Sequence, residues 1–267
     1  MKLFKGFFSE RKAEAWPCIF LSAYSKKVYG QAAAKTLMLQ ILYEDRDIIV
    51  AVKPAGTESQ SARRFAPDMV SEIKKHLVIN RLCTPGKEPY VAVIHRLDKP
   101  VSGIMVYGKT KKAAAVLSGQ VQNGKMEKIY EAVVCGKPVD NVDNFVDYLK
   151  KSVDGNYSQV VEKGIKDAKR AELSYEALET KLTEEGVLTL VRIRLKTGRH
   201  HQIRVQFAAH GFPLYGDIKY NPGFAGKEGG LALCAVSLAF AHPETGKRME
   251  FTKKPSGGIF EKFYQGE

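Results

Sequence analysis

Alternating apolar residues mark several strands that follow one another along the chain. The clearest pattern lies in residues 186–198, where Val187, Val191 and Leu195 share one face of a predicted strand. Shorter strand patterns lie at residues 48–52, 91–94, 104–109 and 126–136. Because strands outnumber helices and are often consecutive, the sequence predicts an α+β fold. We expect a mainly antiparallel or mixed sheet flanked by helices and loops.

Helical spacing of apolar residues occurs in three segments. Residues 61–80 carry apolar side chains three and four positions apart, which indicates a helix with one apolar face. Residues 111–123 are also predicted to be helical, and a third helix is predicted within residues 200–211. The apolar side of this third helix is expected to consist of Ile203, Phe207 and Ala208.

The chain of 267 residues is long enough for one large domain or two small ones. Residues 1–37 show aromatic clusters among charged residues without a sustained period, so we predict an N-terminal appendage with no recognised domain. Residues 38–267 are expected to form the main domain. Within it, we expect a hairpin at residues 39–56 and a polar connection with short strand-like pieces at residues 138–170.

The charge of the chain favours a polyanionic partner. Lys and Arg number 42 and Asp and Glu number 29, which gives a formal net charge of +13. Cationic side chains that neutralise phosphates release condensed counterions, so RNA or DNA is a natural partner. Apolar runs fall short of the roughly 18 residues that a membrane helix needs, and the N-terminus is unlike a signal peptide. We therefore expect a cytoplasmic protein without a membrane partner.

The four cysteines are widely separated and form no CxxC pair. This spacing argues against a structural zinc site and against a disulfide framework. His95, His200 and His201 have no acidic or Cys partner at metal-ligand spacing, so no metal site is predicted. Motifs for nucleotide, dinucleotide, zincin and serine-hydrolase chemistry are also absent from the sequence.

One acid and one basic cluster remain as candidates for chemistry. Asp98 stands in the polar turn HRLDKPVSG between two predicted strands, a rigid mount for a reactive carboxylate, although Asp also commonly caps such turns. Arg199, His200 and Arg204 lie in TGRHHQIR, where a strand ends and a helix begins. An arginine there can clamp phosphate or pair with a buried acid, or simply be solvated.

The turn around Asp98 resembles the catalytic signature of the RluA branch of the RNA pseudouridine synthases. That signature is a strand, H-R-L-D, a short turn with Ser/Thr-Gly, and another strand, as in HRLDKPVSGIMVYGKT. Four further blocks resemble the family in the same order: YEDRDIIVAVKPAG, EKIYEAVVCG, LKTGRHHQIRVQFAAHGFPLYGD and LAFAHPETGK. The blocks span about residues 41–255, and five in order are far more specific than one.

The resemblance implies a role for each matching residue. Asp98 corresponds to the catalytic aspartate, and Arg204 to the arginine that pairs with it. Tyr130 corresponds to the tyrosine that packs against the target base and is implicated in proton transfer. Arg96 matches an arginine that helps to occupy the space left by the extruded base. A carboxylate that stays ionised away from water needs such a cationic partner.

Three features depart from the family pattern. Cys234 stands where the family commonly has His, and His200 stands where TGRTHQ would have Thr. His200 and its neighbour Arg199 are predicted to contact RNA, so the second departure bears on phosphate contacts. Residues 1–37 lack an S4-type RNA-binding domain, which many relatives carry ahead of the catalytic domain.

The resemblance implies an RNA uridine isomerase that needs no cofactor and no obligatory protein partner. One alternative is a catalytically silent RNA-binding or RNA-folding module, against which the presence of Asp98, Tyr130 and Arg204 together counts. Another is a nucleoside hydrolase, which requires a second acid near Asp98, but residues 90–110 contain no other Asp or Glu. The order of bond breaking, the oligomeric state and the target in ribosomal or transfer RNA are left open by the sequence.

Overall fold

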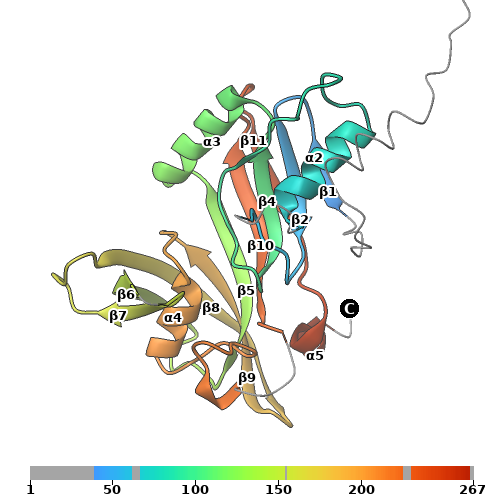
Figure 1. Cartoon of the computed structure of the whole chain (residues 1–267). Coiled ribbons are helices and arrows are strands. Elements are labelled where there is room, and N and C mark those ends of the chain that lie inside the picture. Colours follow the sequence, from blue (N-terminus) through green and yellow to red (C-terminus); the bar gives the residue numbers. More distant parts are fainter. Residues whose placement is uncertain (1–38, 62–66, 154, 225–229, 265–267) are drawn as a thin grey trace, which may run out of the picture. The chain divides into compact units, whose positions relative to one another are not determined.

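Eleven strands form one sheet in the computed structural model, which describes residues 39–61, 67–153, 155–224 and 230–264 (Figure 1). The main path through the sheet is β1-β2-β4-β10-β5-β9-β8-β6-β7, while β3 pairs with β4 and β11 with β10. The strands are β1 (Gln40–Glu44), β2 (Ile48–Lys53), β3 (Ala92–Val93), β4 (Ser102–Gly108), β5 (Glu127–Cys135), β6 (Val142–Lys151), β7 (Ser158–Val161), β8 (Lys169–Thr183), β9 (Gly186–Leu195), β10 (Leu233–Ala241) and β11 (Arg248–Thr252). The predicted appendage at residues 1–37 lies outside the described residues, so its boundary stays a prediction.

The sheet is mixed because one pair of strands in the described part of the chain is parallel. β4 and β10 run parallel, with Ser102 opposite Cys234 and Gly103 opposite Ala235. The other pairs are antiparallel, which confirms the predicted α+β class with a mainly antiparallel sheet. Gly103 has a φ of +136°, and a Cβ atom at this position would lie 2.5 Å from Ala235. The parallel pair therefore requires a glycine at this point.

The predicted opening hairpin is confirmed by the antiparallel pairing of β1 and β2. Asp45 shapes the turn between them, because its carboxylate accepts the backbone N–H groups of Asp47 and Ile48, both at 2.8 Å. All six residues of β2 are buried. β2 is thus an interior strand of the sheet, next to β4, and it ends where Pro54 follows Lys53.

The helices are α2 (Met69–Ile79), α3 (Lys111–Gln122), α4 (Gln202–Ala209) and the short α5 (Glu261–Tyr264). Asp68 and Thr110 cap the N-termini of α2 and α3 through their side chains, as the sequence pattern of helix starts leads one to expect. The predicted apolar face of α2 is confirmed by the burial of Met69, Val70, Ile73 and Leu77. No helix among the described residues is long and apolar enough to cross a membrane.

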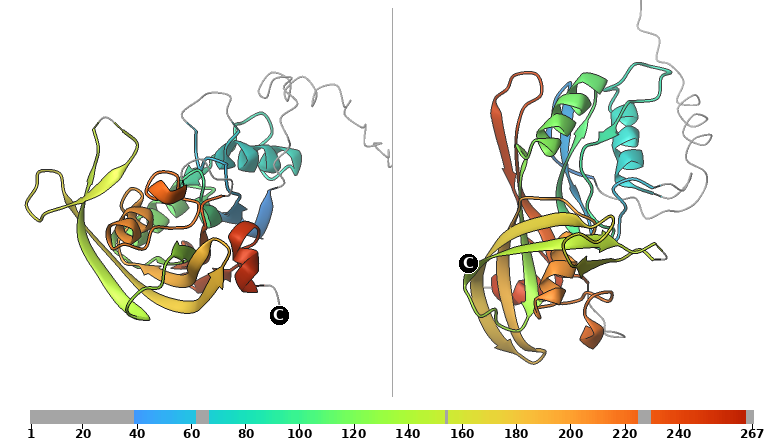
Figure 2. Two further views of the ribbon diagram at one scale, coloured as in Figure 1. Left: turned by 90° about the horizontal axis from the view of Figure 1, so that it is seen from below. Right: turned by 90° about the vertical axis from the view of Figure 1, so that its left-hand side faces the viewer.

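The helix predicted within residues 200–211 is confirmed as α4, but it is buried on more than the side that was expected to be apolar. Every residue from Gln202 to Phe207 is buried, including Arg204, whereas Ala208 is only half-buried. The reason is visible in Figure 2, where the long strands β6, β8 and β9 curve around α4. Phe207 packs against Phe145 of β6 and Tyr175 of β8, with ring centroids 5.1 Å and 5.4 Å apart.

The segment 138–170 contains more sheet than the sequence predicted. β6 is a strand of ten residues that pairs with both β7 and β8, not a set of short pieces. Phe145 and Leu149 of β6 are buried, while Asn144 and Val146 on either side of Phe145 are exposed. The polar residues that indicated a loop therefore belong to the outward face of a strand.

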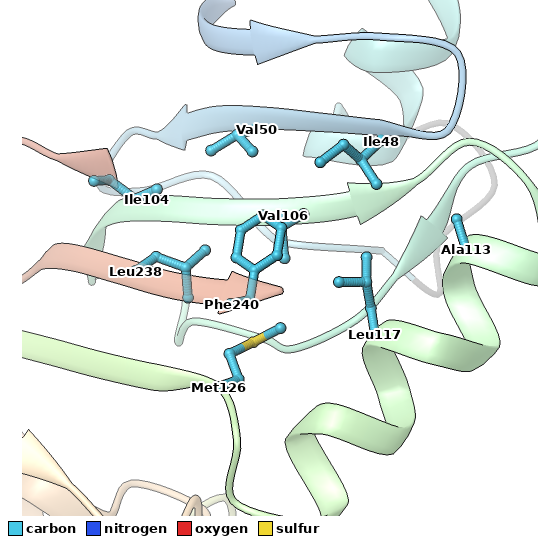
Figure 3. Packing of buried hydrophobic residues seen from close by; sticks show 9 residues of the cluster. All are labelled: Ile48, Val50, Ile104, Val106, Ala113, Leu117, Met126, Leu238 and Phe240. Carbon is cyan, nitrogen blue, oxygen red and sulfur yellow. The ribbon is translucent and has the colours of Figure 1, made fainter. Parts of the chain in front are cut away.

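Two apolar clusters pack against the central strands of the sheet, and both include residues of β10. One joins β2, β4 and β10 to α3, and its members point toward one another in Figure 3: Ile48, Val50, Ile104, Val106, Ala113, Leu117, Met126, Leu238 and Phe240. The other joins β5, β9 and β10 to the C-terminal segment around Ile259 and Phe260. Cys234 belongs to this second cluster and is buried, so its departure from the family pattern is accommodated as core packing.

Candidate active site

Asp98 lies in the turn between β3 and β4, just before the parallel pair begins. Its side chain is 29 % exposed. The turn is held on both sides of the carboxylate: the N–H of Leu97 donates to the hydroxyl of Ser59 at 3.1 Å, and the N–H of Val101 donates to the Asp98 carbonyl at 3.0 Å. Among the described residues, the carboxylate accepts no backbone N–H, so the capping role considered for Asp98 is not seen.

A buried lysine also holds the turn that carries Asp98. Lys53 at the end of β2 is fully buried, and its Nζ donates to the carbonyls of Pro54, Thr57 and Lys99 at 3.1, 2.7 and 3.1 Å. Burial lowers the pKa of Lys53 to about 8, while the negative charge of Asp98 acts in the opposite direction. Because Lys99 follows Asp98, this contact ties the turn to β2.

Arg204 reaches Asp98 from α4 but is held mainly by a second carboxylate. Its Nη1 lies 3.4 Å from Oδ2 of Asp98. Its Nε and Nη2 donate to the two carboxylate oxygens of Asp217, each at 2.7 Å, in a bidentate pair. The Arg204 side chain is 4 % exposed and that of Asp217 is fully buried. The short contacts to Asp217 fix the guanidinium, and the longer one points it at Asp98.

Arg204 and Asp217 both keep their charges although they are buried. Burial alone would lower the pKa of Arg204, but its hydrogen bonds to Asp217 and the charges of Asp217 and Asp98 hold that pKa above its usual range. Burial likewise would raise the pKa of Asp217, but Arg204 and the N–H groups of Lys219 and Tyr220 keep it below its usual range. Both groups are therefore ionised at neutral pH.

His201 is the third side chain at Asp98. Its Nε2 lies 3.5 Å from Oδ2 of Asp98, and its Nδ1 lies 2.8 Å from the hydroxyl oxygen of Tyr220. His201 begins α4 with a φ of 53°, in the left-handed region. Burial lowers the pKa of His201 to about 4 against the opposing charge of Asp98, so its ring is neutral.

Tyr130 approaches the same region from β5. It is opposite Ala235 of β10 and Ile193 of β9, and its side chain is buried. Burial raises the pKa of the Tyr130 hydroxyl, and the nearby negative charge of Asp98 raises it further. The hydroxyl therefore keeps its proton at neutral pH. Asp98, Tyr130 and Arg204, far apart in sequence, are brought into one neighbourhood.

The three predicted RNA contacts differ in their surroundings. Arg96 and Arg199 are exposed, and Arg199 donates from Nε to the carbonyl of Arg170 at 2.9 Å. His200 is half-buried, with its ring nitrogens 2.9 Å from the Ser158 hydroxyl and 2.8 Å from the Asn156 side-chain oxygen. His200 thus ties α4 to the loop between β6 and β7.

A hollow of about 580 Å³ opens over Asp98, a size in the range of small-molecule sites. Asp98 lines it from the turn before β4 and Arg204 from α4, and Lys99 and Lys219 add positive charge. Asp98 is the only acid among the described residues that line this hollow. The lining of the hollow therefore offers an anionic ligand several cationic side chains and one carboxylate.

Three residues of this site were not assigned roles from the sequence. Asp217 lies in the quoted block LKTGRHHQIRVQFAAHGFPLYGD, but nothing in its pattern indicates that it is buried against Arg204. Tyr220 and the fully buried Lys53 were missed for the same reason. The detectable signal was a charged residue in an apolar run, as Lys53 is in IIVAVKP.

The described residues contain no group of three or more His, Cys, Asp or Glu side chains that could hold a metal ion.

The family model described as RNA pseudouridylate synthase matches residues 47–209, a span that includes the Asp98 turn, β5 and α4. An uncharacterised RNA pseudouridine synthase of Bacillus subtilis is 34 % identical over 224 residues, which is 82 % of this chain and 69 % of that protein. The ribosomal large subunit pseudouridine synthase D of Pseudomonas aeruginosa is 30 % identical over 85 % of this chain and 71 % of its own.

A solved structure supports the fold. Human RNA pseudouridylate synthase domain containing 1 superposes with a TM-score of 0.66 at 21 % identity, over 84 % of this chain and 86 % of that one. The sequence match covers more than half of the chain and includes each of the elements that bring Asp98, Tyr130 and Arg204 together. The chain therefore belongs to the RNA pseudouridylate synthase family, in its RluA branch, and is an RNA-modifying isomerase.

Proposed function

We propose that Asp98 is the nucleophile with which this enzyme converts uridine in RNA to pseudouridine. The observation that carries the proposal is a half-exposed carboxylate on the floor of a hollow, facing a buried arginine that is itself held by Asp217. The positively charged guanidinium of Arg204 lies 3.4 Å from Oδ2 of Asp98, the carboxylate proposed to attack. The bidentate bond to Asp217 keeps that charge in place before the substrate arrives.

The reaction needs no added reagent. The bond between N1 of uracil and C1′ of ribose breaks, and a bond between C5 and C1′ forms. The hydrogen on C5 leaves as a proton, and N1 gains one, so atoms and electrons balance without a cofactor. We assign to Tyr130 the packing against the uracil ring and a part in the proton transfer, consistent with a buried hydroxyl that stays protonated beside Asp98.

The substrate is proposed to be a structured ribosomal or transfer RNA. Two relatives from different bacteria are named as large-subunit ribosomal enzymes, so ribosomal RNA is tested first. A uridine in folded RNA must leave its stack, which costs a few kcal/mol. We assign Arg96, Arg199 and His200 to contacts that offset this cost on the flanking RNA.

Two other functions make different products. A silent RNA-binding module would leave the RNA unchanged, and a hydrolase would release free uracil. A hydrolase of the two-carboxylate type needs a second acid that activates water. The second carboxylate at this site, Asp217, is fully buried and bound through both oxygens to Arg204, which opposes that role.

The test is nucleoside analysis of RNA from cells that lack the gene, after incubation with the purified protein. We expect pseudouridine to appear at defined positions with the wild-type chain and not with Asp98→Asn, which is nearly isosteric but far less nucleophilic. Free uracil would contradict the isomerase assignment. Pseudouridine made equally well by the Asn variant would contradict the role of Asp98.

A further inference from the structure

His201 has a backbone conformation that its residue type rarely adopts. Its φ of 53° and ψ of 24° place it in the left-handed region, at the N-cap position of α4, without a side-chain capping bond. A non-glycine residue in this region costs roughly 1 kcal/mol, and such residues concentrate at functional sites. The conformation turns the imidazole inward, where it is buried between Asp98 and Tyr220.

A continuous chain of polar contacts passes through this imidazole. The backbone N–H of Ser158 donates to the hydroxyl oxygen of Tyr220 at 2.7 Å. That oxygen lies 2.8 Å from Nδ1 of His201, and Nε2 of His201 lies 3.5 Å from Oδ2 of Asp98. The chain of contacts therefore joins the first residue of β7 to the carboxylate of Asp98.

Donor and acceptor requirements assign the protons. An ionised Asp98 only accepts, so the proton of a neutral imidazole belongs on Nε2. Nδ1 is then an acceptor, and the Tyr220 hydroxyl must donate to it. The hydroxyl oxygen has a second lone pair, which the Ser158 N–H occupies. The contacts with Asp98, Tyr220 and Ser158 are therefore all satisfied when the proton of His201 is on Nε2.

The charges around His201 keep it in that neutral form. Arg204, His200 and Lys219 oppose a positive charge on the ring, as burial does, and Asp98 alone favours it. His200 also stacks on His201 with ring centroids 3.8 Å apart. A Tyr220 hydroxyl that donates to Nδ1 disfavours protonation there as well.

Arg204 and His201 both approach the same oxygen of the Asp98 carboxylate. Nη1 of Arg204 and Nε2 of His201 lie 3.4 Å and 3.5 Å from Oδ2. Among the described residues no side chain makes a hydrogen bond or ion pair with Oδ1. Both distances are longer than an optimal hydrogen bond, as is common for catalytic contacts before substrate binds.

We propose that His201, held in one tautomer by Tyr220, is a positioning residue that donates from Nε2 to Oδ2 of Asp98 and leaves Oδ1 free to attack. This inference rests on the proposed role of Asp98 as nucleophile. His201 itself acts through Asp98 and takes no proton from the substrate. Arg204 supplies the charge at the carboxylate, and His201 fixes its rotation.

The test compares two substitutions that differ in the reach of their side-chain amide; Asn accepts the left-handed conformation more readily than Gln, so backbone strain works against rescue by Gln and cannot produce it. His201→Asn tolerates the left-handed conformation, yet its amide is too short to reach Asp98. His201→Gln carries an N–H donor at about the position of Nε2. We expect the single-turnover rate to fall roughly 10- to 100-fold in His201→Asn and to recover largely in His201→Gln, with RNA affinity within about twofold of wild type in both.

Tyr220→Phe and His210→Gln complete the set. Tyr220→Phe keeps the ring that lies over Arg204 but loses the hydroxyl. The ring of His201 is then protonated at higher pH, so the acid limb of the rate profile should move upward. His210→Gln changes the histidine at the other end of α4, which pairs with Asp147 away from the hollow, and should leave the single-turnover rate unchanged.

The tautomer is measured independently by ¹⁵N NMR of the histidine rings in the full chain, with His201 assigned from the spectrum of His201→Gln. We expect a neutral ring with its proton on Nε2 down to about pH 5. A proton on Nδ1, a charged ring at pH 6, or a wild-type rate in His201→Asn would overturn the proposal. An active Asp98→Asn variant together with the expected tautomer would overturn the nucleophile assignment while leaving the hydrogen-bond chain intact.

Discussion

Arg204 is shared between two carboxylates that do different work. It forms two bonds of 2.7 Å with the fully buried Asp217 and one contact of 3.4 Å with the half-exposed Asp98. The first partner stabilises the fold and fixes the guanidinium plane. The second, Asp98, lies close to the positive charge of Arg204 at the proposed site of reaction. A single residue therefore couples stability to chemistry, and substitutions at position 204 should affect both.

Replacing Arg204 by Met leaves Asp217 buried without its cation, which we expect to lower the free energy of unfolding by about 3–5 kcal/mol. Arg204→Lys keeps a charge but loses the planar fork, so its losses of stability and rate should be smaller. Urea denaturation and single-turnover rates measure the two effects. Arg248→Met, which breaks an exposed pair with Glu127, is the control and should cost less than about 1 kcal/mol. Equal stability of the two Met variants would contradict the anchoring role of Asp217.

At the scale of elements, one buried lysine, Lys53, connects the end of β2 to the turn that carries Asp98. The pKa of Lys53 is lowered to about 8 by burial, below the value near 10.4 of an unfolded chain. Between these values the unfolded chain binds a proton that the folded chain has lost. The free energy of unfolding should therefore rise with pH from about 8 to 10, by on the order of 1 kcal/mol per pH unit from this group.

Lys53→Met removes this titration. We expect its stability relative to wild type to become worse as pH rises from 8 to 10, measured by denaturation at each pH. Lys112→Met, which removes a lysine exposed on α3, should run parallel to wild type over the same range. Parallel curves for Lys53→Met and wild type would show that burial does not affect the titration of Lys53.

The parallel pairing of β4 with β10 depends on a missing side chain. Gly103→Ala would place a methyl group 2.5 Å from the backbone and Cβ of Ala235, at a φ of +136°. We expect a loss of more than about 3 kcal/mol, since both steric overlap and backbone strain oppose the change. Gly119→Ala on α3 meets open space and should instead stabilise by about 0.5–1 kcal/mol. Thermal unfolding distinguishes them, and a neutral Gly103→Ala would show that the two strands can separate.

Elements with a clear apolar pattern were predictable from the sequence, and features that depend on tertiary contacts were not. The apolar face of α2 follows directly from its sequence spacing, and β2 and β9 follow from theirs. The helix α4 was predicted, but the burial of its polar residues was not, because strands curve around it. β6 was predicted only as short strand-like pieces, because its outward face is polar. At the site, Asp98 and Arg204 were found from motifs. Asp217 and Tyr220 were not, because only folding brings them against Arg204.

At the scale of the whole molecule, the eleven strands and three apolar clusters of the described residues lie within residues 39–264. We therefore expect residues 38–267 to fold alone, with a cooperative thermal transition and an unchanged single-turnover rate. The seven cationic residues of the removed segment are expected to contact RNA, so affinity should weaken and its salt dependence should flatten. These residues are Lys2, Lys5, Arg11, Lys12, Lys26, Lys27 and Lys35. Insoluble or molten protein would show that residues 1–37 belong to the fold.

We expect the net charge of +13 and the cations around the hollow to bring RNA to the partly exposed carboxylate of Asp98. The most direct test of that carboxylate is tritium release from RNA labelled at C5 of uracil, measured in single turnover with wild type and Asp98→Asn. The Asn variant should bind the RNA with near wild-type affinity and release no tritium above background, because the proton on C5 leaves only when isomerisation proceeds. Release by Asp98→Asn within about tenfold of the wild-type rate would contradict the assignment of Asp98 as the nucleophile.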